Sequence, residues 1–265
     1  MAAGAAITLD PVEIGRRLAA ADVAVLDVDG CMYPGYTQIT LGHRLLNGFL
    51  RRELRHPPSS LFLWRLAAKG GYLYWIRFWI RKPERRNYLL QKHYALAFDG
   101  ITRTDIRAIL PRVWKKLDTH VHPCLAFLAD RLPLGIISLG LDVILDGLPE
   151  HLRRHHQAVR FLFCCSNRII WNDGHFAGLV PPIRVGAADK ADLFHTAAER
   201  HRVGIPLVIG HNSEERELCR LAAQRGGLSI GMNPAAGDRD AFDVVIEDGS
   251  WKTLHSFLRE NWPSG

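Results

Sequence analysis

Six short apolar runs rich in β-branched residues alternate along the chain with longer stretches of helical periodicity. Runs that are apolar throughout are typical of strands buried on both faces of a parallel sheet. Helices are expected between them over 141–156, 189–203 and 213–225. The alternation predicts an α/β protein with a Rossmann-like, three-layer, doubly wound and mostly parallel sheet. The expected strands are 23–27, 134–138, 159–165, 206–210, 228–232 and 243–247.

About a hundred residues separate the first expected strand from the second. A whole crossover needs only a dozen or so residues, so something is inserted there. The interval is helical and basic in pattern, which predicts a helical cap domain over 34–121. Residues 1–33 and 122–265 would then form the α/β core domain.

The net charge of +7 favours anionic partners such as phosphorylated metabolites, nucleic acid or an acidic membrane surface. The five cysteines follow no metal-ligand spacing, which suggests reduced core thiols and a cytoplasmic location. No basic region precedes an apolar stretch at the N-terminus, so no secretory signal is expected. The most hydrophobic segment, 61–80, is interrupted by Arg65, Lys69 and Arg77 and is not expected to span a bilayer.

Two carboxylates follow the first expected strand, Asp27 at its end and Asp29 after one spacer, before Gly30. The carboxyl end of a buried strand faces the crevice in which open α/β sheets bind ligands. A cation or a proton has to relieve the repulsion between the two acids. One carboxylate could attack phosphorus while the other exchanges protons, as in phosphoryl transfer through a covalent intermediate. The alternative interpretation is a polar turn after a strand.

Two further candidates follow later elements. Ser138 ends the second expected strand, where its hydroxyl and the neighbouring N–H groups could bind a phosphate oxygen. A helix-initiating serine is the alternative. Lys190 opens an expected helix and could compensate two aspartates and a phosphate, although a cation there opposes the helix dipole. The alternative is a solvated surface lysine.

In their order along the chain, these residues resemble the motifs of a known superfamily. Asp27-Val-Asp29-Gly30, Ser138, Lys190 and the VIGHNSEERE turn are similar to the four motifs of the haloacid dehalogenase superfamily. The likeness is to its phosphoserine-phosphatase-like branch, which carries a helical cap between motifs one and two. DGHFAGLV at 173–180 resembles a β-hairpin of that branch, and the resemblance covers about residues 23–246.

The resemblance implies a phosphoric monoester hydrolase. Asp27 would be the nucleophile and a metal ligand, and Asp29 the general acid and base that also offers its carbonyl to the metal. Ser138 and Lys190 would hold the phosphoryl oxygens, and the phosphate site would also include Asp27, Gly30 and Leu139. The aspartate at the second position disfavours halide displacement, because a halide leaving group needs no proton.

The fourth motif departs from the family pattern, because His211 stands where the family has its metal-binding aspartate. The expected metal site comprises Asp27, Asp29, His211, Asn212 and Glu215. Mg²⁺ is the expected cofactor, and Mn²⁺ is the alternative because an imidazole is a poor ligand for Mg²⁺. Asn212 and Glu215 also have the spacing of a helix capping box, which is an alternative role for both.

The cap sequence adds a separate hypothesis. Residues 61–82 interleave aromatic and basic side chains, and no acid occurs between Glu53 and Glu84. Such a segment suits peripheral contact with an anionic membrane, or a lipid-like phosphorylated substrate. Packing of the rings into the cap's own core is the alternative. No nucleic-acid motif is recognisable, so no nucleic-acid partner is expected.

Taken together, these features predict a metal-dependent phosphatase that hydrolyses a small phosphomonoester through an aspartyl-phosphate intermediate. The substrate's identity and the oligomeric state are not encoded in any motif of the chain. The alternative is a catalytically impaired protein of the same fold, which binds a phosphoryl ligand or acts as a membrane-associated interaction protein.

Overall fold

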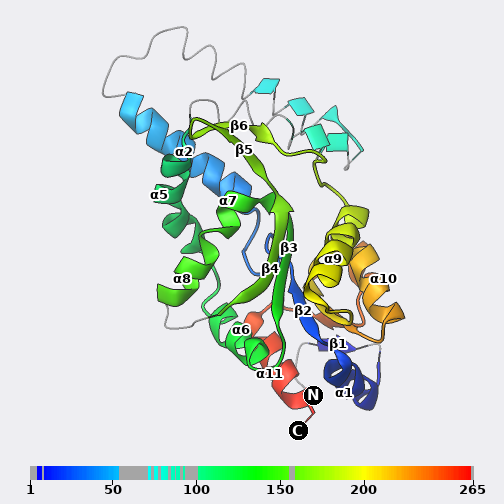
Figure 1. Ribbon diagram of the computed structural model, residues 1–265. Coiled ribbons are helices and arrows are strands. Elements are labelled where there is room, and N and C mark those ends of the chain that lie inside the picture. The colour runs from blue at the N-terminus through cyan, green and yellow to red at the C-terminus, as the bar shows by residue number, and fades with distance from the viewer. Residues whose placement is uncertain are drawn as a thin grey trace.

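The computed structural model describes residues 5–7, 9–53, 101–154 and 159–263, together with scattered residues between 71 and 92 (Figure 1). Much of the predicted cap, including most of its aromatic and basic segment, therefore lies outside the described residues.

A seven-stranded sheet forms the centre of the described structure. Its order is β1-β9-β8-β7-β2-β3-β4, in which β1 is antiparallel to β9 and every other pair is parallel. The central strand β2 is buried along its whole length between β7 and β3. The strands are β1 (Ala5–Ile7), β2 (Val23–Leu26), β3 (Leu134–Leu141), β4 (Phe161–Asn167), β7 (Pro206–Gly210), β8 (Leu228–Met232) and β9 (Val244–Ile246).

Helices cover both faces of the sheet, as Figure 1 shows. Val23 and Val25 of β2 belong to a core shared with α9 and α10, whereas Ala24 and Leu26 belong to a core shared with α1, α6 and α11. This alternation follows from the two-residue period of a strand. The predicted three-layer α/β fold is therefore confirmed. The helices are α1 (Pro11–Ala20), α6 (Val121–Ala129), α9 (Ala187–His201), α10 (Arg216–Gln224) and α11 (Trp251–Asn261).

All six predicted strands are present, but two features of the sheet differ from expectation. β1 was not predicted from the sequence, and it adds an antiparallel edge beside β9. β4 was expected to be buried on both faces, yet it forms the other edge and leaves Leu162 exposed. An edge strand has one neighbour only, so less of its surface is covered.

The position of β4 also corrects the prediction for the cysteines. All five are free, and Cys31, Cys124 and Cys219 are buried as expected. Cys164, however, is exposed and Cys165 is only half-buried, because both lie on the edge strand.

The helix expected over 141–156 is divided in two, α7 (Asp142–Leu145) and α8 (Leu148–Arg154). The break contains Gly147, where a side-chain carbon would lie 3.0 Å from Nε1 of Trp114. Pro149 is the second residue of α8, where a proline is tolerated, whereas it would interrupt one helix running through the whole segment. The other two expected helices are present as α9 and as a 3₁₀ turn, η1 (Ser213–Glu215), that leads into α10.

Of the predicted cap, α2 (Thr37–Glu53) and α5 (Arg103–Trp114) are described as whole helices, and they pack against each other. The hairpin of β5 (Ile169–Asn172) and β6 (His175–Leu179) lies beside the start of α5. Trp114 of α5 is fully buried in the main core and donates a hydrogen bond from Nε1 to the Ile144 carbonyl at 3.1 Å. The domain boundaries at 34 and 121 stay a prediction.

Among the helices of the described part of the chain, none is both long and apolar enough to cross a membrane.

Candidate active site

Asp27 follows the last residue of β2 and is only 5% exposed. Its Oδ1 accepts a hydrogen bond from Lys190 Nζ at 2.8 Å, and its Oδ2 lies 3.0 Å from His211 Nδ1. Burial alone would raise the pKa of Asp27, but the charges of Lys190 and His211 outweigh it and hold that pKa below its ordinary value. Asp27 is thus a buried carboxylate that remains ionised.

Lys190 reaches this point from the first turn of α9 and is 1% exposed. Its ammonium group also donates to Glu215 and lies 3.8 Å from Glu214 Oε2. Burial opposes the charge, yet Asp27 and Glu215 outweigh it and raise the pKa of Lys190 well above its ordinary value. The alternative of a solvated surface lysine is therefore wrong.

Asp29 is half-buried in the loop between β2 and α2. Its Oδ1 accepts a hydrogen bond at 2.7 Å from the backbone N–H of Thr37, the first residue of α2. Burial raises the pKa of Asp29 to about 6. A carboxyl group with this pKa can both give and take a proton near neutral pH.

Ser138 lies inside β3, which continues to Leu141, so the prediction that it ends the strand is wrong. The pairing of β3 with β4 shifts register between Ile137 and Leu141, and the intervening residues form an irregular segment. Within it, the Gly140 N–H donates to Ser138 Oγ at 3.0 Å. A carbon added at Gly140 would lie 3.1 Å from Ser138 Oγ and 3.7 Å from Asp29 Oδ2, so both groups flank this glycine.

Two buried amides that support this segment were missed in the sequence. Asn167, at the end of β4, donates from Nδ2 to the Leu139 carbonyl at 2.8 Å and to the Arg184 carbonyl at 2.9 Å. Gln38 of α2 lies 3.5 Å from the same Leu139 carbonyl. The available signal was a polar residue close behind an apolar run, since Asn167 follows the run 159–165 after one serine.

The loop after β7 carries the predicted fourth motif. Asn212 Oδ1 accepts from the Glu214 N–H at 2.7 Å, and Glu215 Oε2 accepts from the Asn212 N–H at 3.0 Å, so the capping box is confirmed. Glu215 Oε2 also lies 3.3 Å from the His211 backbone nitrogen. Burial raises the pKa of the adjacent Glu214 to about 7. The capping box thus holds the backbone of His211 next to Asp27 and Lys190.

His211 and Gly30 are in close contact. A side-chain carbon at Gly30 would lie 2.1 Å from His211 Nε2, and the φ of Gly30 is +77°. Burial would lower the pKa of His211, but its hydrogen bond with Asp27 outweighs it and raises that pKa. The Gly30 N–H donates within its own turn, to Tyr33 at 2.9 Å and Gly35 at 2.8 Å. The contact of Gly30 with phosphate stays a prediction.

Asp27, His211 and Glu215 could hold a metal ion, because their ligand atoms all lie within 4.8 Å of one another. Two carboxylates and an imidazole fit a divalent cation, and they suit Mn²⁺ better than Mg²⁺. The amide oxygen of Asn212 and Oε2 of Glu215 both accept hydrogen bonds in the capping box, and Oε1 of Glu215 accepts one from Lys190, so a bound cation would share these oxygens. Asn212 and Asp29 as metal ligands stay predictions.

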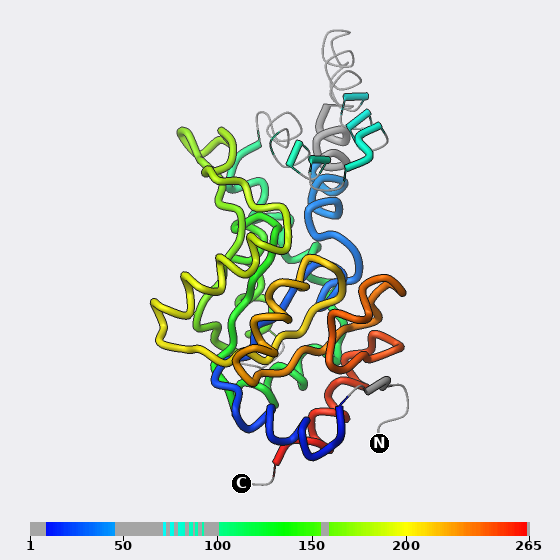
Figure 2. Tube along the Cα trace, turned by 90° about the vertical axis from the view of Figure 1, so that its right-hand side faces the viewer, coloured from blue at the N-terminus to red at the C-terminus, as the bar shows by residue number. Residues whose placement is uncertain are grey.

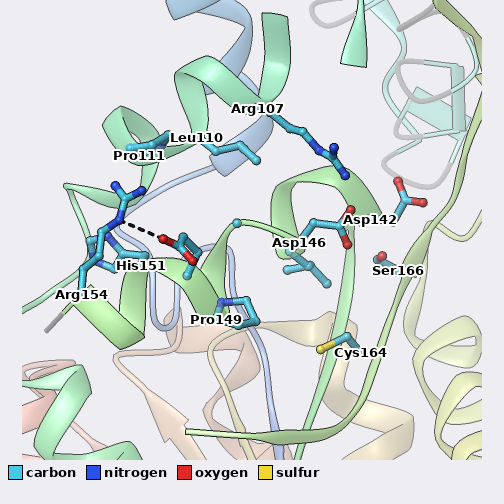
Figure 3. Close-up of a pocket in the computed structure, with 13 residues that line it drawn as sticks. Arg107, Leu110, Pro111, Asp142, Asp146, Pro149, His151, Arg154, Cys164 and Ser166 are labelled. Atoms are coloured by element: carbon cyan, nitrogen blue, oxygen red, sulfur yellow. Dashed lines mark hydrogen bonds and ion pairs between the residues drawn. The ribbon is translucent and has the colours of Figure 1, made fainter. Parts of the chain in front are cut away.

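A separate cavity of about 570 Å³ opens between α5, α7, α8 and β4 (Figure 3). No residue of the Asp27 cluster lines it. Its charged lining combines Arg107 and Arg154 with Asp142, Asp146 and Glu150, and Arg154 lies 3.2 Å from Glu150. Because these charges offset one another, the cavity lacks the positive excess that a phosphate ester requires.

No protein-family profile and no curated protein matches this sequence. Solved structures do match its fold. A phosphoserine phosphatase, solved as a phospho-aspartyl intermediate analogue, is 14% identical with a TM-score of 0.60, over 89% of this chain and 98% of that chain. Cytosolic 5′-nucleotidase IIIB bound to cytidine is 15% identical with a TM-score of 0.61, over 98% and 94%.

A HAD family hydrolase from Salmonella enterica subsp. enterica serovar Typhi is 16% identical with a TM-score of 0.54, over 86% of this chain and 67% of that chain. At these identities, the likenesses establish a common fold.

Proposed function

We propose that this chain, which has the haloacid dehalogenase-like fold, is a metal-dependent phosphatase that acts through an aspartyl-phosphate on Asp27. The observation that carries the proposal is the position of Asp27, which is buried between the ammonium group of Lys190 and the imidazole of His211, two contacts that lower its pKa. A carboxylate has to be ionised to attack phosphorus. Substrates of this class include phosphoserine and 5′-nucleotides, for which similar solved structures are named.

In the first step, an oxygen of Asp27 attacks phosphorus, and the bond between phosphorus and the substrate's ester oxygen breaks. Protonated Asp29 gives its proton to the departing oxygen, which leaves as a neutral alcohol. In the second step, the Asp29 carboxylate takes a proton from water, whose oxygen attacks phosphorus and releases Asp27 and inorganic phosphate. The pKa of about 6 for Asp29 suits both roles.

Ser138 and Lys190 would bind the phosphoryl oxygens. Ser138 Oγ lies beside Gly140, which Asp29 also approaches, while Lys190 binds Asp27 directly. Their hydroxyl and ammonium groups would stabilise the charge that develops on those oxygens. Asn167 positions this segment through the Leu139 carbonyl.

A divalent cation bound by Asp27, His211 and Glu215 would neutralise the phosphoryl charge and favour its approach to the nucleophile. We expect Mn²⁺ to bind more tightly than Mg²⁺, because the imidazole of His211 replaces an oxygen ligand. In His211→Asp this preference should shift toward Mg²⁺. Electron paramagnetic resonance of bound Mn²⁺, with Mg²⁺ as competitor, measures the shift without any turnover.

Hydrolysis of p-nitrophenyl phosphate in Mn²⁺ or Mg²⁺ tests the reaction. Asp27→Asn should lower kcat on the order of 10⁴-fold, because the nucleophile is lost. The matched control is Asp130→Asn, which changes an exposed aspartate at the end of α6 and should leave activity unchanged. Circular dichroism of each variant excludes misfolding. Substantial turnover by folded Asp27→Asn would refute the mechanism.

The contact of His211 with Asp27 Oδ2 favours one rival function, a protein of this fold that binds a phosphoryl ligand without turning it over. Beryllium fluoride, a mimic of the phosphoryl group on aspartate, separates the two. Binding that depends on Asp27 together with hydrolysis supports the phosphatase. Binding without hydrolysis in any divalent cation supports the rival.

A further inference from the structure

Three aromatic side chains are exposed among the described residues of the cap segment. Residues 71, 72, 75, 76 and 79 are all helical. Tyr72, Trp75 and Trp79 are 39%, 48% and 71% exposed, whereas Ile76 is buried. Their spacing of three and then four residues is the spacing of side chains that share one face of a helix. We call them the aromatic stripe, and they do not form the cap's own core.

Positive charge is concentrated in the same segment. Residues 54–98 hold nine lysines and arginines and one acid, Glu84, so their net charge is +8, whereas that of the whole chain is +7. The rest of the chain is therefore close to neutral. Arg81, Lys82 and Arg85 directly follow the aromatic stripe and are exposed.

The stripe also has a defined place in the molecule. In Figures 1 and 2 the described residues between 71 and 92 lie at the end of the molecule that also carries the outer end of α2 and the β5–β6 hairpin, and the two chain termini lie at the opposite end. A surface at one end of an elongated protein can meet a flat partner without interference from the core.

We propose that the aromatic stripe and its neighbouring cations dock this protein on the surface of an anionic lipid bilayer. Exposed tryptophan and tyrosine rings partition to the boundary between headgroups and acyl chains, and adjacent cations bind acidic headgroups. The partner is anionic because the segment has almost no acid to balance its cations. This surface goes beyond the proposed phosphatase activity and requires no turnover.

The ring geometry favours lipid over single-stranded nucleic acid, which would use the same charges. The rings of Tyr72 and Trp75 stack on each other, with centroids 6.4 Å apart and planes 14° from parallel. Each ring thereby covers a face of the other. The stacked pair therefore offers at most one face of each ring to a base, whereas insertion at a lipid interface needs no free ring face.

Co-sedimentation of the full chain with phosphatidylcholine vesicles, with and without 30 mol% phosphatidylserine, tests the proposal. Wild-type protein should bind the anionic vesicles at low salt and dissociate as salt screens the charges. Each cation near such a surface contributes about fivefold to binding. Arg81→Gln/Lys82→Gln should therefore bind about 25-fold more weakly. Trp75→Ala/Trp79→Ala should weaken binding on the order of tenfold or more.

The charge-matched control is Lys115→Gln/Lys116→Gln, which removes two exposed, adjacent lysines after α5. This control should bind like the wild type. A blue shift of tryptophan fluorescence on binding, lost in Trp75→Ala/Trp79→Ala, locates the contact at the stripe. Absence of vesicle binding at low salt would overturn the proposal, and so would an equal loss in the control. Tighter binding of single-stranded RNA through Arg81 and Lys82, without vesicle binding, would also overturn it.

Discussion

Replacing Lys190 by methionine should destabilise the fold strongly, because it leaves two buried carboxylates without their shared cation. Lys190 is 1% exposed, as is Glu215, and Asp27 is 5% exposed. Removing one partner of a buried ion pair costs about 3–5 kcal/mol. Methionine retains most of the side-chain volume, so the loss reports charge rather than a cavity. For a protein of this size, that cost corresponds to roughly 6–20 °C in Tm.

The pH dependence of the stability loss in Lys190→Met shows whether the missing charge causes that loss. In the wild type the folded pKa of Asp27 is lowered, so its ion pair stabilises the fold above the unfolded pKa of about 4, and this stabilisation is lost as pH falls through the folded pKa. Without the ammonium group, two of the causes that lower the pKa of Asp27 are lost, so that pKa would rise. The free energy of unfolding of Lys190→Met should therefore fall furthest below that of the wild type at pH 8, and the difference should shrink as pH falls to 5.

Urea denaturation at pH 8 and pH 5 in the presence of EDTA provides the measurement. Lys190→Met/Glu215→Gln should regain part of the loss at pH 8, because it removes one of the unpaired charges. Lys115→Met is the control, since Lys115 is exposed. A deficit below about 1 kcal/mol, the size typical of an exposed pair, would refute the account, and so would a deficit equal at both pH values.

Asp29→Asn should stabilise the protein by up to about 3 kcal/mol at pH 7.5, because a folded pKa of about 6 against an ordinary 3.8 makes the buried charge costly. The wild type loses about this much free energy of unfolding as pH rises from about 4 to about 6, because Asp29 ionises there. Urea titrations should therefore show no gain in stability for Asp29→Asn at pH 4. An equal gain at pH 4 and pH 7.5 would contradict the raised pKa of Asp29. Gly30→Ala should cost about 3 kcal/mol or more, because its added carbon would lie 2.1 Å from His211 Nε2 at a positive φ. Gly35→Ala, at a φ of +85° in open space, should cost only about 1–2 kcal/mol, and similar melting curves for the two variants would exclude a close contact at Gly30.

The sequence by itself determined six of the strands, two of the three expected core helices and the place of the two acids after β2. Apolar runs between helical stretches predicted six strands, because burial on both faces leaves a local pattern that needs no partner to recognise. The spacing of Asp27 and Asp29 after such a run predicted two acids at a strand end. The capping box at Asn212 and Glu215 was predictable as well, since its hydrogen bonds join residues three apart.

Only the tertiary structure decided which side chains meet and which strands are covered. β4 has the apolar pattern of an interior strand but lies at the sheet edge, a consequence of strand order and not of its own residues. The irregular segment at Ser138 depends on pairing with β4, and Asn167 acts on it from that neighbour.

Lys190 lies 163 residues from Asp27 in sequence, and His211 lies 184 residues from it. Contacts over such separations are set by how the strands are ordered in the sheet. For that reason the charges of the cluster, and the protonation of its acids, were visible only in the folded molecule.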